Sequence, residues 1–304
     1  MITYKCRKCG GEMSISPAGE LVCAYCGTKE NFSDAELRGY REFRNSMLQY
    51  LAAAAGKNTD TYAAEQLWNY AETKSFQSDD GEDIEIKYLF TAVDDGIEMY
   101  MAKESVIYVF PAGRAGDAQK MLENIAKMQY PKADMKGLAN YVPSLIARFD
   151  LSDDGALLVF KKSDNMYPLG AFGRLEYIHA AWVLSRLENL CCMLEFSNLC
   201  HGGITLEGIF IDPYTHEAAL YGGWWKATPE RNGSKEDLKS IRKVIDRLLG
   251  VDKNDVPKGF LDFLKSAPAM DAYADFGEWD QVIETKMGGR HFHKLTLDQV
   301  KKES

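Results

Sequence analysis

Four cysteines near the amino terminus have the residue type and the spacing to bind a metal ion. Cys6 and Cys9 form one C-x-x-C pair and Cys23 and Cys26 form a second, each followed by glycine, with thirteen residues between the pairs. Two thiolates three positions apart on a tight turn can reach one ion, and the glycine permits that turn. Four soft thiolates favour Zn²⁺ and leave no open position for a reactive water. The cysteines therefore predict a structural zinc site.

The segment around these cysteines, residues 1–30, resembles a zinc ribbon. Short alternating stretches on either side of Pro17 and Gly19 have the pattern of two strands and a turn between the knuckles. So small a module cannot bury enough apolar surface to fold alone, and we expect zinc to provide most of its stability. A pair of redox dithiols is the alternative interpretation of the same cysteines.

The composition predicts a globular protein without a membrane span. Of 304 residues, 46% are hydrophobic and 27% are charged, and no apolar run approaches the ~20 residues that cross a bilayer. The first residues show no basic region followed by an apolar segment, so a cytoplasmic location is expected. The formal net charge of −9 argues against a surface built for nucleic acid, although a local basic patch stays open.

A helical connector is predicted over residues 31–82. Ser33 has the position of a helix cap, and Leu37, Tyr40, Phe43 and Met47 recur at helical spacing. Such an apolar stripe needs a partner, either the following domain or a second chain. The remaining chain divides into a main domain, residues 83–285, and a carboxyl-terminal tail, residues 286–304.

The main domain begins with strand patterns and continues with helical ones. Strand periodicity covers residues 84–93, 97–101 and 105–110, and a helix is expected over 117–129. Residues 144–150 and 156–160 form a hairpin pattern around Asp153-Asp154-Gly155, and the chain after residue 170 is mostly helical. The expected fold class is therefore α+β, with a β-rich part followed by a helical part.

This order of elements, together with specific residues, resembles the protein kinase family over about residues 84–285. The stretch from His201 to Asp212 resembles the kinase catalytic loop, and Leu220-Tyr221-Gly222-Gly223-Trp224 falls where the D-F-G segment lies. Asp237, in a helical pattern, has the position of the buried aspartate that braces that loop in the family. The resemblance implies a bilobal kinase-like domain, with a small β-rich lobe and a helical lobe, preceded by the zinc ribbon and the connector.

The residues that perform phosphoryl transfer in that family are missing from this chain. The lysine of the third strand is replaced by apolar residues around Val109, although Glu123 is available for the helix glutamate. His201 is present, but Gly203 stands at the position of the base, Gly208 at that of the asparagine and Gly222 at that of the metal-binding aspartate. Because catalysis there is mostly electrostatic, these losses predict a pseudokinase of the bacterial or phage type that is not an enzyme and binds no nucleotide.

The sequence-based hypothesis is therefore a non-catalytic pseudokinase with a structural zinc ribbon that works as a scaffold or regulator by binding protein partners. Trp224 and Trp225 could plug the site or anchor such a partner. Two alternatives remain. An atypical kinase-fold phosphotransferase or nucleotide-binding protein would use displaced acidic residues: Asp94, Asp95, Glu123, Glu207 and Asp212. A nucleic-acid-binding regulator would use the ribbon, where four basic and three acidic side chains give no clear preference.

Overall fold

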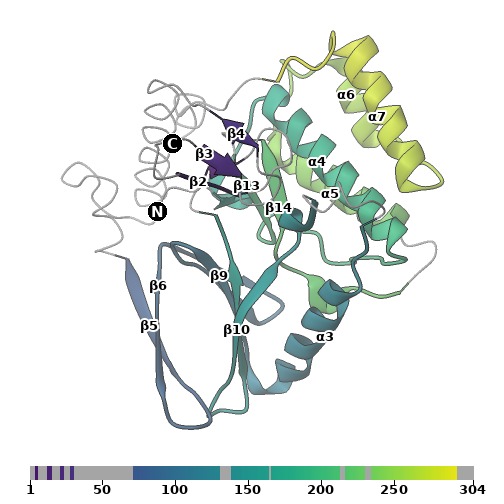
Figure 1. The fold of residues 1–304 in the computed structure, drawn as a ribbon. Helices are drawn as coiled ribbons and strands as arrows, with labels where there is room; N and C mark the ends of the chain where they lie inside the picture. The colour runs from purple at the N-terminus through teal and green to yellow at the C-terminus, as the bar shows by residue number, and fades with distance from the viewer. Residues whose placement is uncertain are drawn as a thin grey trace. The chain divides into compact units, whose positions relative to one another are not determined.

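The computed structural model describes residues 4–5, 12–15, 21–23, 28–30, 71–130, 138–163, 166–212, 216–229 and 234–292. The chain divides into two compact units (Figure 1). The first unit comprises Met1–Ala118 and Lys132–Met166, and the second comprises Gln119–Pro131 and Tyr167–Ser304. The stripe predicted between residues 31 and 70 lies outside the described residues, as do residues 293–304 of the tail.

The first unit begins with a small antiparallel sheet in which each strand pairs with the next along the chain. Its strands are β1 (Tyr4–Lys5), β2 (Glu12–Ile15), β3 (Leu21–Cys23) and β4 (Lys29–Glu30). In such a meander the end of β1 and the start of β2 lie at the same edge as the end of β3 and the start of β4. The two C-x-x-C stretches occupy those two connections in the sequence.

The main sheet of the first unit has five antiparallel strands in the order β10-β11-β9-β8-β7. They are β7 (Phe90–Asp94), β8 (Ile97–Met101), β9 (Ser105–Phe110), β10 (Ser144–Asp150) and β11 (Ala156–Lys161). Asp95 and Gly96 connect β7 to β8 with φ angles of 55° and 77°, which a two-residue hairpin turn requires. The hairpin expected around Asp153-Asp154-Gly155 is present as β10 and β11.

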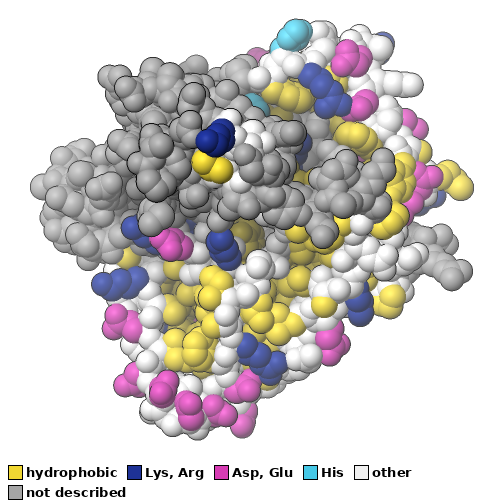
Figure 2. Space-filling view, viewed as in Figure 1, with side chains coloured by type: hydrophobic (Ala, Val, Ile, Leu, Met, Phe, Trp, Pro, Cys, Tyr) yellow, Lys and Arg dark blue, Asp and Glu magenta, His cyan; other side chains and the backbone are white. Residues whose placement is uncertain are grey.

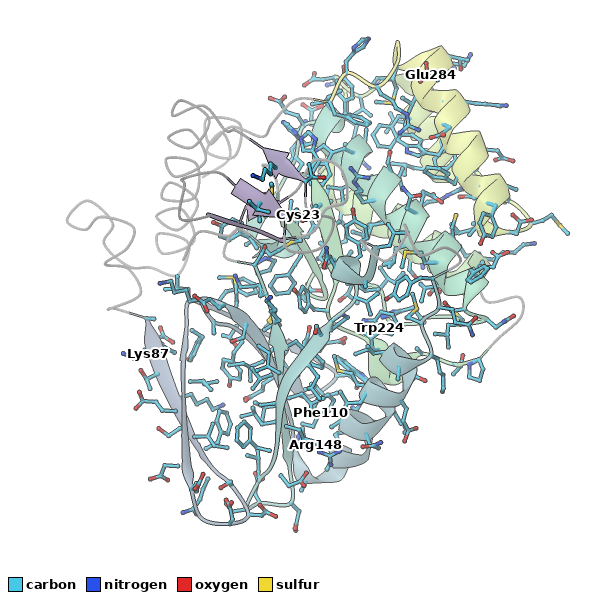
Figure 3. All side chains as sticks on the ribbon, in the orientation of Figure 1. Cys23, Lys87, Phe110, Arg148, Trp224 and Glu284 are labelled. Carbon is cyan, nitrogen blue, oxygen red and sulfur yellow. The ribbon has the colours of Figure 1, made fainter. Side chains whose placement is uncertain are left out.

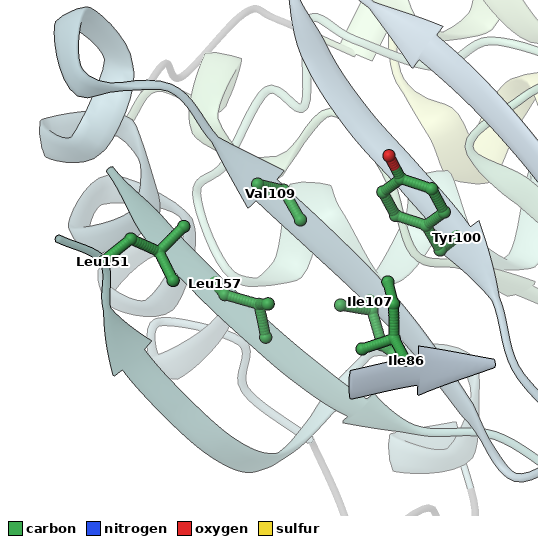
Figure 4. Close-up of a cluster of buried hydrophobic side chains, with 6 residues drawn as sticks. All are labelled: Ile86, Tyr100, Ile107, Val109, Leu151 and Leu157. Atoms are coloured by element: carbon green, nitrogen blue, oxygen red, sulfur yellow. The ribbon is translucent and has the colours of Figure 1, made fainter. Parts of the chain in front are cut away.

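An additional hairpin precedes this sheet. Residues 72–77 were expected in the helical connector, but they form β5 (Glu72–Gln77), which pairs with β6 (Asp83–Tyr88). The boundary at residue 83 therefore falls within a hairpin. The hairpin packs on the main sheet through a cluster of buried side chains (Figure 4): Ile86, Tyr100, Ile107, Val109, Leu151 and Leu157. Partner side chains on the sheet, which are distant in sequence, override the helical spacing of this short stretch.

The second unit is built around one long buried helix, α4 (Tyr177–Phe196). Thirteen of its 20 residues are buried, so it is apolar on most sides, as a central helix must be. Three helices pack in the same unit: α5 (Ser234–Leu248), α6 (Lys258–Lys265) and α7 (Ala272–Lys286). Trp279 of α7 lies between Phe260 and Phe263 of α6, with ring centroids 4.9 and 5.2 Å away.

A three-stranded sheet completes the second unit and holds the loops of interest. Its strands are β12 (Tyr167–Pro168), β13 (Ile209–Asp212) and β14 (Glu217–Leu220), in the order β12-β13-β14. The helix α3 (Ala115–Ala126) belongs to the first unit up to Ala118 and to the second from Gln119. Within the described ranges, no helix combines the length and the apolar character needed to cross a membrane.

Candidate functional site

Two loops of the second unit lie against each other through their backbones. One runs from Cys200 to β13, and the other runs from β14 to Thr228. Cys200 and Thr228 exchange two backbone hydrogen bonds of 2.9 Å at one end of this pair. At the other end, the N–H groups of Tyr221 and Gly222 donate to the carbonyl oxygen of Gly208 at 2.8 and 3.1 Å. These loops contain the glycines expected at the catalytic positions, and we call them the glycine loop pair.

Gly203, expected at the position of the base, faces backbone. A Cβ atom there would lie 2.9 Å from the Gly223 carbonyl oxygen, 3.0 Å from its Cα and 3.1 Å from Cδ of Lys226. Real Cβ atoms essentially never approach backbone so closely without a shift of the neighbour. The position therefore has no room for an aspartate in this arrangement.

Gly208 and Gly223 of the loop pair are confined as well. A Cβ atom on Gly208 would lie 3.1 Å from Cα of Gly222, so these two glycines meet directly. Gly223 has φ +82°, and its Cβ would overlap the Gly203 carbonyl oxygen and lie 2.7 Å from Cε1 of His201. Glycine is therefore required here both by backbone conformation and by space.

His201 is fully buried within the glycine loop pair. Its Nδ1 accepts a hydrogen bond of 3.2 Å from the N–H of Gly203, and its ring meets Trp224 edge to face at 4.8 Å. Burial lowers the pKa of His201 to about 3, so the imidazole is neutral at physiological pH. These contacts with Gly203 and Trp224 maintain the shape of the loop.

Asp237 of α5 binds the backbone of the loop that runs from Cys200 to β13. Its carboxylate accepts hydrogen bonds from the N–H groups of His201 at 2.7 Å and Gly202 at 2.9 Å, and only 1% of the residue is exposed. Burial raises the pKa of this carboxyl group, while the two hydrogen bonds oppose that shift. The contacts correspond to the bracing position that the kinase resemblance implies.

Replacing Asp237 by asparagine should destabilise the second unit by about 1–3 kcal/mol, because one amide oxygen cannot replace two carboxylate acceptors for buried donors. Urea unfolding followed by tryptophan fluorescence measures this change. Glu236→Gln is the matched control, since Glu236 is the neighbouring residue, is exposed and forms an exposed ion pair with Lys239 at 2.7 Å. Equal stability of the two variants would contradict the bracing role of Asp237.

Trp224 and Trp225 are interior side chains, so the hypothesis that they anchor a partner is corrected. Trp224 is 0% exposed and Trp225 is 5% exposed, and Trp224 Nε1 donates to the Leu220 carbonyl oxygen at 2.8 Å (Figure 3). The amide of Asn124 in α3 donates to the carbonyl oxygens of Trp224 and Ala227 at 2.9 and 2.8 Å. The two indole rings are therefore part of the packed interior of the second unit.

Two further expected positions are Val109 in the first unit and Glu123 in the second. Val109 is buried in the cluster beneath the β5–β6 hairpin. Glu123 of α3 is exposed and accepts a hydrogen bond of 2.9 Å from Gln119 one turn earlier.

The displaced acidic residues do not form one described group. Asp94 and Asp95 belong to the first unit, where Asp95 pairs with Arg114 at 3.1 Å. Glu207 and Asp212 belong to the second unit, and Asp212 is buried on β13, opposite Glu217. No observation therefore favours the alternative in which these acids bind a nucleotide.

Of the four cysteines expected to bind zinc, only Cys23 lies among the described residues. It is buried on β3, and its N–H donates to the Thr28 carbonyl oxygen at 2.9 Å, across the second C-x-x-C turn. Among the described residues there is no group of three or more metal-binding side chains. Cys6, Cys9 and Cys26 fall outside that part of the chain.

Two residues of the site, Asn124 and Lys226, could not be identified from the sequence. Asn124 lies 100 residues before its acceptor at Trp224. Lys226 lies beside Gly203, and its Nζ is 5.8 Å from the ring centroid of Trp225. Both contacts depend on the approach of segments that are distant in the chain.

The comparisons with known proteins identify the fold. No family model and no curated protein matches the chain. A solved chain described as "Structure of vaccinia related kinase 3" matches with a TM-score of 0.51 and 14% identity, covering 79% of this chain and 95% of that one. At this identity the likeness shows the fold alone: a kinase-like fold with a β-rich part and a helical part.

The prediction that the chain is not an enzyme is corrected, because the fold comparison does not show catalytic inactivity. The solved chain that shares the fold is itself described as a kinase, and a distant fold match carries no statement of catalytic inactivity. What the structure establishes is narrower. A Cβ atom on Gly203 or Gly208 would meet backbone, and no carboxylate or amide side chain is present at Gly203, Gly208 or Gly222.

Proposed function

We propose that this protein, whose fold is that of a protein kinase, works as a recognition module that holds protein partners in a regulatory or scaffolding complex. The glycine loop pair carries this proposal. Where the fold in other proteins places side chains that handle phosphate, this chain places backbone against backbone, closed by Asp237 and Asn124. The segment thus contributes a rigid shape, and rigid surfaces bind partners with a low entropic cost.

The test is affinity capture by the full chain from its native cells, followed by reconstitution with the purified candidate partner. We expect a complex of defined stoichiometry that forms again from the two purified components. Failure of every captured protein to bind again would overturn the proposal. The same purified partner is incubated with the chain and Mg-ATP, and that assay decides separately whether the chain transfers phosphate.

We further propose that the four-stranded sheet at residues 4–30 is a zinc ribbon, with Cys6, Cys9, Cys23 and Cys26 as ligands. The strands place the ends of the two C-x-x-C connections at one edge of the sheet, and thiolates are the donors that Zn²⁺ prefers. The N–H of Cys23 donates a hydrogen bond to the Thr28 carbonyl oxygen across the second C-x-x-C turn. The zinc would be structural, so the ribbon would present a surface to a partner.

The zinc proposal predicts about one zinc ion per chain by elemental analysis, and its loss from the double variant Cys6→Ser/Cys9→Ser. Cys192→Ser is the control, because Cys192 lies on α4 in the second unit and should leave the zinc content unchanged. Removal of zinc by a chelator should unfold the ribbon, since such modules take most of their stability from the metal. A chain purified without zinc that has unchanged protease resistance at residues 1–30 would contradict this prediction.

A further inference from the structure

One face of the first unit is apolar and only partly covered. The β5–β6 hairpin packs on the five-stranded sheet over a buried cluster, and hydrophobic side chains around this cluster are only partly buried. Figure 2 shows hydrophobic side chains gathered at the surface over β6, β9 and β10. The partly buried members of this layer are Phe76, Ile84, Tyr88, Ala102, Phe149 and Val159. We call them the apolar face.

The apolar face ends at a strongly acidic edge formed by two turns. The turn of the β5–β6 hairpin contains Asp79, Asp80 and Glu82, and Asp83 follows as the first residue of β6. The β10–β11 turn contains Asp153 and Asp154, and Asp150 precedes it as the last residue of β10. Neither turn contains lysine or arginine. All of these carboxylate residues are exposed, and Figure 2 shows acidic side chains along the lower margin of the hydrophobic area. We call them the acidic edge.

The two turns are fixed side by side by backbone hydrogen bonds. The N–H of Asp79 donates to the Asp150 carbonyl oxygen at 3.0 Å, and the N–H of Ser152 donates to the Gln77 carbonyl oxygen at 2.9 Å. Ser78 and Leu151 form the bridge between them. The fold therefore holds like charges together within about one Debye length, which opposes folding unless another charge offsets it. Arg148 pairs with Asp150 at 3.0 Å, so one carboxylate already has such a charge.

Apolar area and charge together define which partner this surface fits. Burial of the apolar face would supply affinity, and the acidic edge would supply orientation and a fast association rate. Phosphates of nucleic acids and of anionic membranes would be repelled by the same carboxylates. A second copy of this chain would bring a second acidic edge with it. The complementary surface is a protein segment that carries lysine or arginine beside apolar side chains.

We propose that the apolar face and the acidic edge form one docking surface for a basic amphipathic segment of a partner protein. This inference rests on the recognition function proposed above and names the chemistry of the partner. It uses residues of the first unit only, so it is independent of the glycine loop pair.

The test uses a labelled 18-residue peptide of leucine and lysine with amphipathic spacing, titrated against the full chain by fluorescence anisotropy. The charge variant is Asp79→Asn/Glu82→Gln/Asp154→Asn. The control variant is Asp262→Asn/Glu278→Gln/Glu284→Gln, which removes the same three charges from exposed positions of the second unit. A peptide in which glutamate replaces lysine is the ligand control.

We expect the charge variant to bind the leucine-lysine peptide about tenfold more weakly and with a smaller salt dependence, because exposed ion pairs contribute modestly and add up. The control variant should bind within twofold of the wild type, and the glutamate peptide should not bind. Val159→Thr, which changes polarity with little change in volume, should weaken binding without changing the salt dependence. Its thermal unfolding shows whether it is folded, and Phe149→Thr provides a second apolar variant.

Three results would overturn the docking surface. They are absence of peptide binding to the wild type, an equal loss of affinity in the control variant, and a dimer in light scattering that the charge variant dissociates. The captured partner separates this inference from the recognition function. If a reconstituted partner binds the charge variant as tightly as the wild type, the recognition function stands and the docking surface is wrong.

Discussion

Replacement of Gly223 by alanine is expected to destabilise the second unit by about 3 kcal/mol, the sum of left-handed backbone strain and overpacking against neighbouring backbone. Its φ of +82° already disfavours a side chain, and the new Cβ would lie 2.7 Å from Cε1 of His201 and overlap the Gly203 carbonyl oxygen. Urea unfolding monitored by tryptophan fluorescence measures the change. Four of the five tryptophans, all except Trp68, belong to the second unit, so the signal reports on it.

The matched control for this variant is Gly288→Ala. Gly288 has φ +81° and lies in the same unit, but nothing lies within 4 Å of the position its Cβ would take. The control should therefore show only the backbone strain, about 1–2 kcal/mol. The difference between the two variants isolates the close approach of the loops. A difference near zero would show that the loops separate easily, and the glycine loop pair would lose its rigid character.

The second large effect is expected at Glu188, a carboxyl group that is 0% exposed in the middle of α4. Burial and, to a smaller extent, the neighbouring Asp275 raise the pKa of Glu188 to about 9, against the opposing effect of Arg242. Arg242 of α5 holds Asp275 of α7 by two hydrogen bonds of 2.8 Å, so the arginine is already engaged. Glu188 therefore keeps its proton in the folded protein at neutral pH.

The sign of the pH dependence follows from this raised pKa. Between the usual value of 4.5 and about 9, the unfolded chain loses a proton that the folded chain retains. The free energy of unfolding therefore falls as pH rises through this range, by at most about 1.4 kcal/mol per pH unit. His201 contributes in the opposite direction at lower pH, because it is neutral when folded and becomes protonated when unfolded below 6.5. His201 therefore does not contribute above pH 7, while burial raises the pKa of the Cys191 and Cys192 thiols, which add to the effect of Glu188 as the pH approaches 9.

Glu188→Gln should make this slope clearly smaller between pH 7 and 8.5 and raise the stability at pH 8 by several kcal/mol, since the neutral amide has no proton to lose and only the buried thiols still contribute. Unfolding by urea at four pH values in this range measures the slope. Glu278→Gln, at an exposed position of α7, is the control and should leave the slope unchanged. Parallel pH profiles for the wild type and Glu188→Gln would show that Glu188 titrates normally.

Local sequence was sufficient for the elements whose spacing is short. The Asp95-Gly96 turn and the β10–β11 hairpin follow from turn residues between alternating strands, because a hairpin needs only neighbours in the chain. The long helix α4 follows from a continuous apolar stretch of helix length. The kinase-like order of elements was visible for the same reason. By contrast, residues 72–77 were assigned to a helix because their pairing partners and the sheet beneath them give no local signal.

The sequence by itself determined which side chains are missing: Gly203, Gly208 and Gly222 carry neither carboxylate nor amide, whatever the fold. Only the tertiary structure decided that Gly203 and Gly208 are also closed, because the approach of Gly203 to Gly223 joins segments twenty positions apart. It also decided that Trp224 and Trp225 are interior and that Glu188 meets Asp275, 87 positions later in the chain. Burial and desolvation are properties of packed neighbours, and packing brings together residues that have no relation in the sequence.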